Sequence, residues 1–126
     1  MKIAVTSTGQ EISSQLEQKF GRAEYFIIAE TSTMEFQVID NKASLEAGGA
    51  GIQAGQTIIN SGATVLITGN VGPNAMKVLK SGKIKIYRGQ RESVEKNIEM
   101  FNKHSLEEIV DSVEAHHGMK NENSST

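Results

Sequence analysis

Glycine-bearing segments interrupt this chain where predicted strands pass into helices or turns. The four segments are Thr8-Gly9, Lys19-Phe20-Gly21-Arg22, Gly48-Gly49-Ala50-Gly51 and Gly69-Asn70-Val71-Gly72-Pro73-Asn74. If most of the strands are parallel, these loops lie at one edge of one sheet, which is where open α/β sheets bind ligands. The pattern therefore predicts a small binding scaffold whose chemistry is at that edge.

Length, charge and composition narrow the class of protein. A chain of 126 residues fits one domain and can bury one continuous core. With 13 Lys and Arg against 15 Asp and Glu, the formal net charge is -2, so no broad basic surface for nucleic acid is expected. The chain has no cysteine, which excludes disulfides and thiolate ligands. No stretch approaches the ~18 apolar residues of a membrane span and the start is too polar for a signal peptide, so we expect a cytoplasmic protein without a membrane partner.

Hydrophobic periodicity and turn residues predict alternating strands and helices. Strands are expected at 3–6, 25–29, 36–39, 65–68 and 84–87, and the second and third form a hairpin. Helices are expected at 12–20, 52–59, 73–81 and 94–101. Ser105 and Glu108 form a capping box, which predicts a last helix that carries Leu106, Ile109, Val110 and Val113.

The order of these elements favours a three-layer α/β fold of the ribonuclease H-like type. An antiparallel start followed by right-handed crossovers gives a mixed five-stranded sheet of order 3-2-1-4-5, with only the second strand antiparallel and helices on both faces. In this topology the glycine segments meet at one edge. We expect one domain over 1–115 and a flexible polar tail over 116–126. The strand residues expected to be buried are Ile3, Val5, Ile27, Val38, Leu66, Ile67, Ile84 and Ile86.

Five stretches of the chain carry a recognisable pattern. They are Lys19-Phe20-Gly21-Arg22-Ala23-Glu24-Tyr25-Phe26, Asn41, Gly49-Ala50-Gly51-Ile52-Gln53-Ala54, Thr68-Gly69-Asn70-Val71-Gly72-Pro73-Asn74-Ala75 and Gly82-Lys83-Ile84-Lys85-Ile86-Tyr87. In order and spacing, over roughly residues 1–103, they resemble the dinitrogenase iron-molybdenum cofactor biosynthesis family. The resemblance implies the ribonuclease H-like fold and a carrier of iron-molybdenum cofactor or of an iron-sulfur precursor, bound transiently. The binding residues it implies are Lys19, Phe20, Gly21, Arg22, Asn41, Gly49, Gly51, Gly69, Asn70, Gly72 and Asn74.

The chain departs from this family in its metal-ligating residues. Family members often carry His before the Phe-Gly pair or before the Gly-Ala-Gly run, where this chain has Lys19 and Gly48 or Gly49. Residues 1–103 contain no histidine or cysteine, and iron in clusters takes thiolate or imidazole ligands. Stable ligation by the core is therefore not expected. His116 and His117 are the weak candidates for a metal, although solvated polar surface is the favoured interpretation of this pair.

Each glycine loop has a functional and a structural interpretation. The run 48–51 before a helix either presents backbone N–H groups to an anion or makes a sharp turn that needs positive φ. The two interpretations are equally supported by the sequence. The run 69–74 is a second helix entrance of the same kind, although Pro73 removes one donor. With Lys19, Arg22 and Arg88 nearby, the loops would form a locally positive cleft suited to a small polyanion.

The sequence offers little for catalysis. The strands at 3–6 and 65–68 contain no acidic residue, Asp40 stands alone, and Ser7 and Ser14 have no core histidine as a base. We therefore expect a binding or carrier protein rather than an enzyme, with an anionic metal cluster or small anion as ligand and a protein partner in cofactor assembly. The alternative is a protein-interaction or regulatory module, or a small-anion binder without a cluster. A hydrolase is the third candidate.

Overall fold

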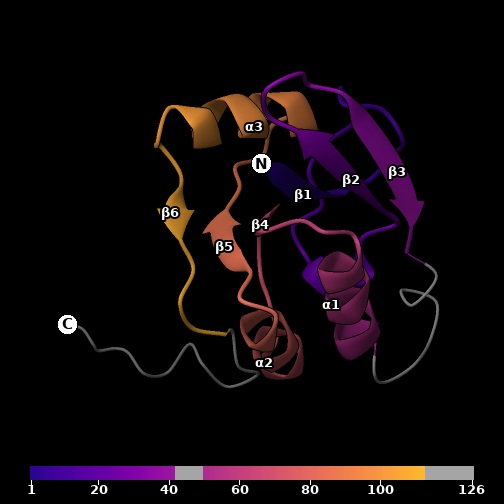
Figure 1. Ribbon diagram of the computed structural model, residues 1–126, viewed down its shortest axis with the longest axis vertical. Coiled ribbons are helices and arrows are strands. Elements are labelled where there is room, and N and C mark those ends of the chain that lie inside the picture. The colour runs from indigo at the N-terminus through magenta and orange to yellow at the C-terminus, as the bar shows by residue number, and fades with distance from the viewer. Residues whose placement is uncertain (42–49, 113–126) are drawn as a thin grey trace.

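The computed structural model describes residues 1–41 and 50–112, and it places one mixed sheet between two layers of helices (Figure 1). The chain order of the elements is β1 (Lys2–Ser7), the 3-10 turn η1 (Phe20–Arg22), β2 (Tyr25–Glu30), β3 (Phe36–Asp40), α1 (Ala50–Asn60), β4 (Val65–Thr68), α2 (Pro73–Ser81), β5 (Lys85–Arg88), α3 (Val94–Asn102) and β6 (Glu107–Glu108). The expected hairpin is thus confirmed, and so are the helices that follow β3, β4 and β5.

The sheet has the order β3-β2-β1-β4-β5-β6. β1 pairs antiparallel with β2, where Val5 lies opposite Ile27, and parallel with β4, where Val5 lies opposite Ile67. β2 and β3 are antiparallel, whereas β4 and β5 are parallel. The carboxyl ends of β1, β3, β4 and β5 therefore lie at one edge of the sheet, which we call the rim.

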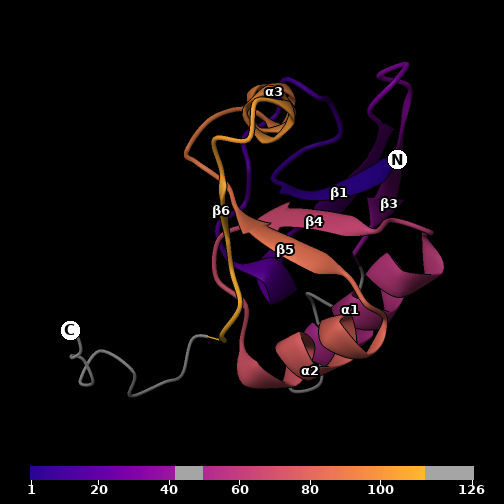
Figure 2. The same ribbon diagram turned by 60° about the vertical axis from the view of Figure 1, so that its left-hand side comes forward.

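Alternating side chains of the strands build a core on each face of the sheet. α1 and α2 cover one face, where Ala4, Leu66 and Ile86 pack with residues of both helices. α3 covers the other face, where Ile3, Val5 and Ile67 pack against it. Figure 2 shows α3 on one side of the sheet and both other helices on the opposite side. This period-2 alternation is what sorts one strand into two cores.

Seven of the eight strand residues expected to be buried are buried, and Val38 is the exception. Val38 is only half-buried because β3 is an edge strand, so its side chain has neighbouring strand residues on one side only. The predicted order 3-2-1-4-5 already placed this strand at an edge, but the apolar character of Val38 still suggested full burial.

A sixth strand replaces the helix expected after Ser105, so the prediction of five strands is wrong. β6 pairs antiparallel with β5, which also makes it a second antiparallel element. The Ser105 hydroxyl donates to the Met100 carbonyl at 2.9 Å and closes α3 instead of opening a helix. Leu106 and Ile109 are buried in opposite cores. A three-residue spacing suits one face of a helix, but it equally places two side chains on opposite faces of a strand.

The helix expected over 12–20 is also wrong. Only Phe20–Arg22 is helical, as a 3-10 turn, and the preceding segment pairs with the end of β1 and with the loops at Ser93 and Asn70. Leu16 donates its backbone N–H to Glu92 O at 3.0 Å, and Glu17 donates to Thr6 O at 3.0 Å. Leu16 and Phe20 are buried in opposite cores. Backbone pairing at the rim therefore takes precedence over the helical spacing of the apolar residues.

Several sequence predictions involve residues outside the described ranges: Gly48 and Gly49 within the run 48–51, Val113 of the expected last helix, the tail over 116–126 with His116 and His117, and the domain end at 115. The tail and the domain end stay predictions. Among the described residues, no helix is long and apolar enough to cross a membrane.

Candidate functional site

A pocket of about 330 Å³ opens at the rim, between η1 and the starts of α1 and α2. We call it the rim pocket. Its volume is near the lower end of that of small-molecule sites. The lining residues are Lys19, Phe20, Gly21, Arg22, Ala50, Gly51, Asn70, Gly72, Pro73, Asn74 and Ala75. The structure thus brings together eight of the residues singled out from the sequence, from three separate glycine segments.

Backbone pairing fixes the loop of η1 against the loop before α2. Phe20 donates its N–H to Asn70 O at 3.0 Å, and Asn70 donates to Gln18 O at 2.6 Å. The Phe20 ring is turned into the core, where it stacks on Phe26 with ring centroids 5.7 Å apart. Phe20 therefore anchors the pocket wall. The cationic residues Lys19, just before η1, and Arg22, at its end, are exposed.

Small residues allow the three walls of the rim pocket to come close. A Cβ added to Gly21 would lie 3.6 Å from Gly51 Cα, and one added to Gly51 would lie 3.2 Å from Ala75 Cβ. Gly51 is a helical residue of α1, and Gly62 is the positive-φ glycine among the described residues. The turn interpretation is therefore wrong for Gly51, because close helix packing explains this glycine. Ala75 ends one of the stretches that carry the family pattern, but it was not among the predicted binding residues, since nothing in the sequence shows which residue faces Gly51.

Charge and free backbone donors at the rim pocket favour an anion. Among the described residues of its lining, only Lys19 and Arg22 carry a charge. α2 begins after Gly72 with no side-chain cap, and the first turns of α1 and α2 contain no acidic residue. The first N–H groups of a helix have no intrahelical acceptor, and the helix dipole is positive there. Pro73 has no N–H, which leaves Asn74 and Ala75 as the donors of the first turn.

Three residues that the sequence assigns to the cleft are not among the lining residues of the rim pocket, and they hold the surrounding loops in place instead. The Arg88 Nη1 atom donates to Gly69 O at 3.3 Å and to Asn70 Oδ1 at 3.5 Å. Gly69 is required because a Cβ there would collide with the Gln18 carbonyl oxygen. Asn41 is buried, and its Nδ2 donates to Ala23 O at 2.9 Å, which ties the end of β3 to the segment before β2.

The donor set does not suit a directly coordinated metal ion. Among the described residues, the rim pocket lining contains no Cys, His, Asp or Glu, and no group of three such residues suited to a metal occurs within 1–41 and 50–112. Iron and zinc take thiolate, imidazole or carboxylate ligands. The pocket instead offers N–H groups and cations, which suit a ligand that already carries negative charge.

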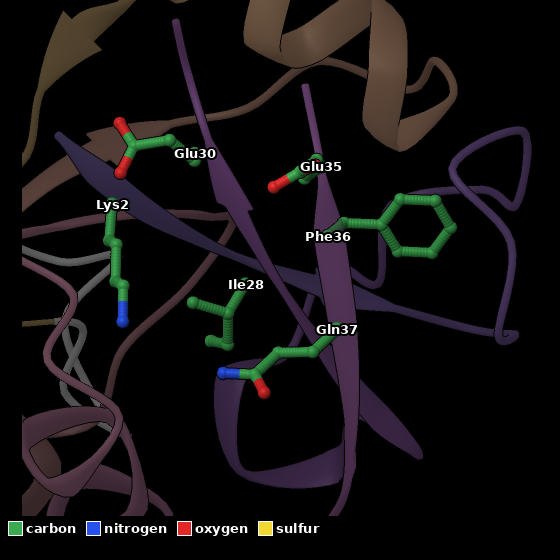
Figure 3. A pocket seen from close by; sticks show the side chains of 6 residues that line it. All are labelled: Lys2, Ile28, Glu30, Glu35, Phe36 and Gln37. Atoms are coloured by element: carbon green, nitrogen blue, oxygen red, sulfur yellow. The ribbon is translucent and has the colours of Figure 1, made fainter. Parts of the chain in front are cut away.

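Two other pockets lie away from the rim. One of about 240 Å³ lies at the opposite end of β1 to β3 and has charges of both signs, from Lys2, Glu30 and Glu35. Figure 3 shows the Phe36 ring pointing away from Ile28 and Gln37. The N-terminal ammonium donates to Glu30 Oε2 at 2.6 Å, and this bond lowers the pKa of the Glu30 carboxyl. The other pocket, about 450 Å³, lies between the end of α2 and β5–β6.

Comparison with known proteins agrees with the sequence pattern. Residues 1–104 match the family described as Dinitrogenase iron-molybdenum cofactor. The chain belongs to this family. The dinitrogenase iron-molybdenum cofactor family thus accounts for most of the chain, and the resemblance inferred from the glycine segments is confirmed.

Proteins with solved structures share the fold of this chain, and a further relative is similar to it in sequence. The apo form of the orange protein from Desulfovibrio gigas is 33% identical, with a TM-score of 0.81 over 86% of this chain and 92% of that one. A Thermotoga protein of the DUF35 family is 35% identical, with a TM-score of 0.79 over 89% of this chain and 96% of that one. An uncharacterized protein of Methanocaldococcus jannaschii is 32% identical over an alignment of length 112, which covers 86% of this chain and 92% of the relative.

Proposed function

We propose that this protein binds a small inorganic polyanion, in particular an anionic metal cluster, in the rim pocket and carries it without covalent ligation. One observation supports this proposal above the others. The starts of α1 and α2 open on the same pocket as Lys19 and Arg22, and no described lining residue is acidic. Helix N-termini and unpaired cations bind anions in many proteins.

The lack of ligating side chains makes the cargo a preassembled one. Because the chain has no cysteine and the described lining has no histidine, the protein itself would donate hydrogen bonds and charge but no metal ligand. A cluster would keep its own sulfide or oxide ligands and present them to the N–H groups of the pocket. Such binding is reversible and depends on salt, as transient carriage requires.

The family relationship supports a metal cluster as the cargo. The family description names the dinitrogenase iron-molybdenum cofactor, and the Desulfovibrio gigas relative is called the orange protein and was solved in its apo form. For this chain we propose iron-molybdenum cofactor or an iron-sulfur precursor as cargo. Transfer would go to a protein partner in cofactor assembly, in the cytoplasm and without nucleic acid or membrane. The protein would bind and release its cargo without catalysis.

Anaerobic calorimetry and visible spectroscopy test the proposal, with phosphate, molybdate and a water-soluble synthetic iron-sulfur cluster as probes. At low salt, Arg22→Ala is expected to weaken binding about five-fold, which corresponds to about 1 kcal/mol for an exposed charge. The difference should shrink as salt rises, and the free energy of unfolding should change by less than about 0.5 kcal/mol.

Lys85→Ala is the matched control, because Lys85 is exposed and begins β5 at the end of the sheet away from the rim. It removes the same charge and should leave binding unchanged. If wild type binds none of the three probes, or if Arg22→Ala binds like wild type at every salt concentration, the rim is better explained as a protein-docking surface.

A further inference from the structure

We infer that Arg88 orients the Asn70 side-chain amide so that its Nδ2 group donates hydrogen bonds to the anion in the rim pocket. The inference rests on the proposed function and assigns one further donor, Asn70 Nδ2, that discriminates between ligands. It assigns Asn70 as a ligand-contacting donor and Arg88 as a positioning residue. Neither role follows from the glycine pattern, because the pattern does not show which end of an amide faces a ligand.

The chemistry of the guanidinium group fixes the amide orientation. Arg88 Nη1 lies 3.5 Å from the near atom of the Asn70 amide and 3.3 Å from Gly69 O. A guanidinium has five donors and no acceptor, so the amide atom that faces it must be the oxygen. A flipped amide would place two donors against each other. The Nδ2 group is therefore turned away from Arg88.

The positions of Asn70 and Arg88 determine where the Nδ2 group of Asn70 points. Asn70 lines the rim pocket and is exposed, whereas Arg88 is not part of the lining. With its oxygen on the Arg88 side, Asn70 presents its NH₂ group on the pocket side. The backbone of Asn70 is held on both sides, by its N–H to Gln18 and its carbonyl to Phe20, so the donor is preorganised.

This arrangement selects ligands by their hydrogen-bonding character. Asn70 Nδ2, the Asn74 and Ala75 amides, Lys19 and Arg22 are all donors, and the described lining offers no side-chain carboxylate as acceptor. A fully deprotonated anion can accept from all of them. A ligand that presents its own N–H or O–H groups would leave donors facing donors, which is costly when the groups lose water.

Asn70→Asp separates the ligand role from a structural one, because it keeps the size of the side chain. The new carboxylate retains its acceptor toward Arg88 and replaces the Nδ2 donor by a negative charge. We expect unchanged or higher Tm and an affinity for molybdate and for the synthetic iron-sulfur cluster that falls about 10- to 100-fold, as for loss of a charged hydrogen bond. The affinity of Asn70→Ala for the same two probes should fall about 10-fold.

A double-mutant cycle tests whether Arg88 acts through Asn70. As a single substitution, Arg88→Gln should weaken molybdate binding. Its effect should be smaller when it is combined with Asn70→Ala, because the amide that Arg88 orients is then absent. The Asn70 side-chain NH₂ signals in ¹⁵N NMR spectra of the wild-type protein should shift on addition of molybdate.

The outcomes separate this inference from the proposed function. If wild type binds neither probe, the proposed function fails and the inference fails with it. If wild type binds the probes and Asn70→Asp and Asn70→Ala bind them as tightly as wild type does, only the inference is overturned. The same holds if the Asn70 NH₂ signals do not shift. An Arg88→Gln effect that is the same in both backgrounds overturns the positioning role of Arg88.

Discussion

Gly69 and Gly72 lie three residues apart in one loop, yet the structure gives them opposite tolerance for a side chain. A Cβ at Gly69 would collide with the Gln18 carbonyl, whereas a Cβ at Gly72 would meet nothing within 4 Å, at a φ of -73°. Gly69→Ala must move backbone, so we expect a loss of about 2–3 kcal/mol in the free energy of unfolding. Gly72→Ala should change it by less than about 0.5 kcal/mol.

Urea titration of both variants measures this difference. Gly72→Ala is the matched control, since both changes add one methyl group to the same loop. Equal stability of the two variants would contradict the close contact between Gly69 and Gln18. The sequence identified both glycines as candidate ligand contacts, but only a three-dimensional neighbour separates a packing requirement from an open position.

At the scale of elements, the packing of α1 on α2 controls the width of the rim pocket. Gly51→Val would press its side chain against Ala75, where even a Cβ lies 3.2 Å from the alanine Cβ. We expect a loss of about 1–2 kcal/mol of stability from overpacking, together with weaker anion binding because the starts of the two helices separate. Thermal denaturation and the calorimetric titrations above measure the two effects.

Gln56→Val is the control for Gly51→Val, because Gln56 is exposed on the same helix. It introduces the same β-branched residue and should cost only a few tenths of a kcal/mol. If Gly51→Val is as stable as wild type and binds molybdate equally well, the contact between Gly51 and Ala75 does not shape the pocket.

The elements that sequence patterns predict correctly are those whose partners follow in chain order. β2 and β3 form a hairpin, and β4 and β5 are joined by the crossover helix α2, so period and turn residues are enough. The segment before Phe20 and the segment after Ser105 take their structure from distant backbone, at Glu92 and at Ile86. Local periodicity contains no information about such pairing, and both segments were wrongly predicted as helices.

For the whole molecule, topology alone brings the candidate site together. The rim pocket assembles η1, which precedes the reversed strand β2, and the starts of α1 and α2, which follow β3 and β4. The order and directions of these strands place all three at one edge of the mixed sheet. That convergence was predictable from element order. The supporting roles of Asn41, Gly69 and Arg88 were not predictable, because they depend on contacts with distant residues. These contacts are to Ala23, Gln18 and Asn70, respectively.

The last prediction concerns the C-terminal residues. The family match ends at residue 104, and Ile109 is buried in the core. Residues 119–126 contain one apolar side chain, Met119, and end in Asn, Ser and Thr. Deleting these eight residues should therefore leave Tm nearly unchanged, because little apolar surface is available there for burial. Differential scanning calorimetry of the full and shortened chains measures this, and a drop of several degrees would mean that the C-terminal residues pack on the domain.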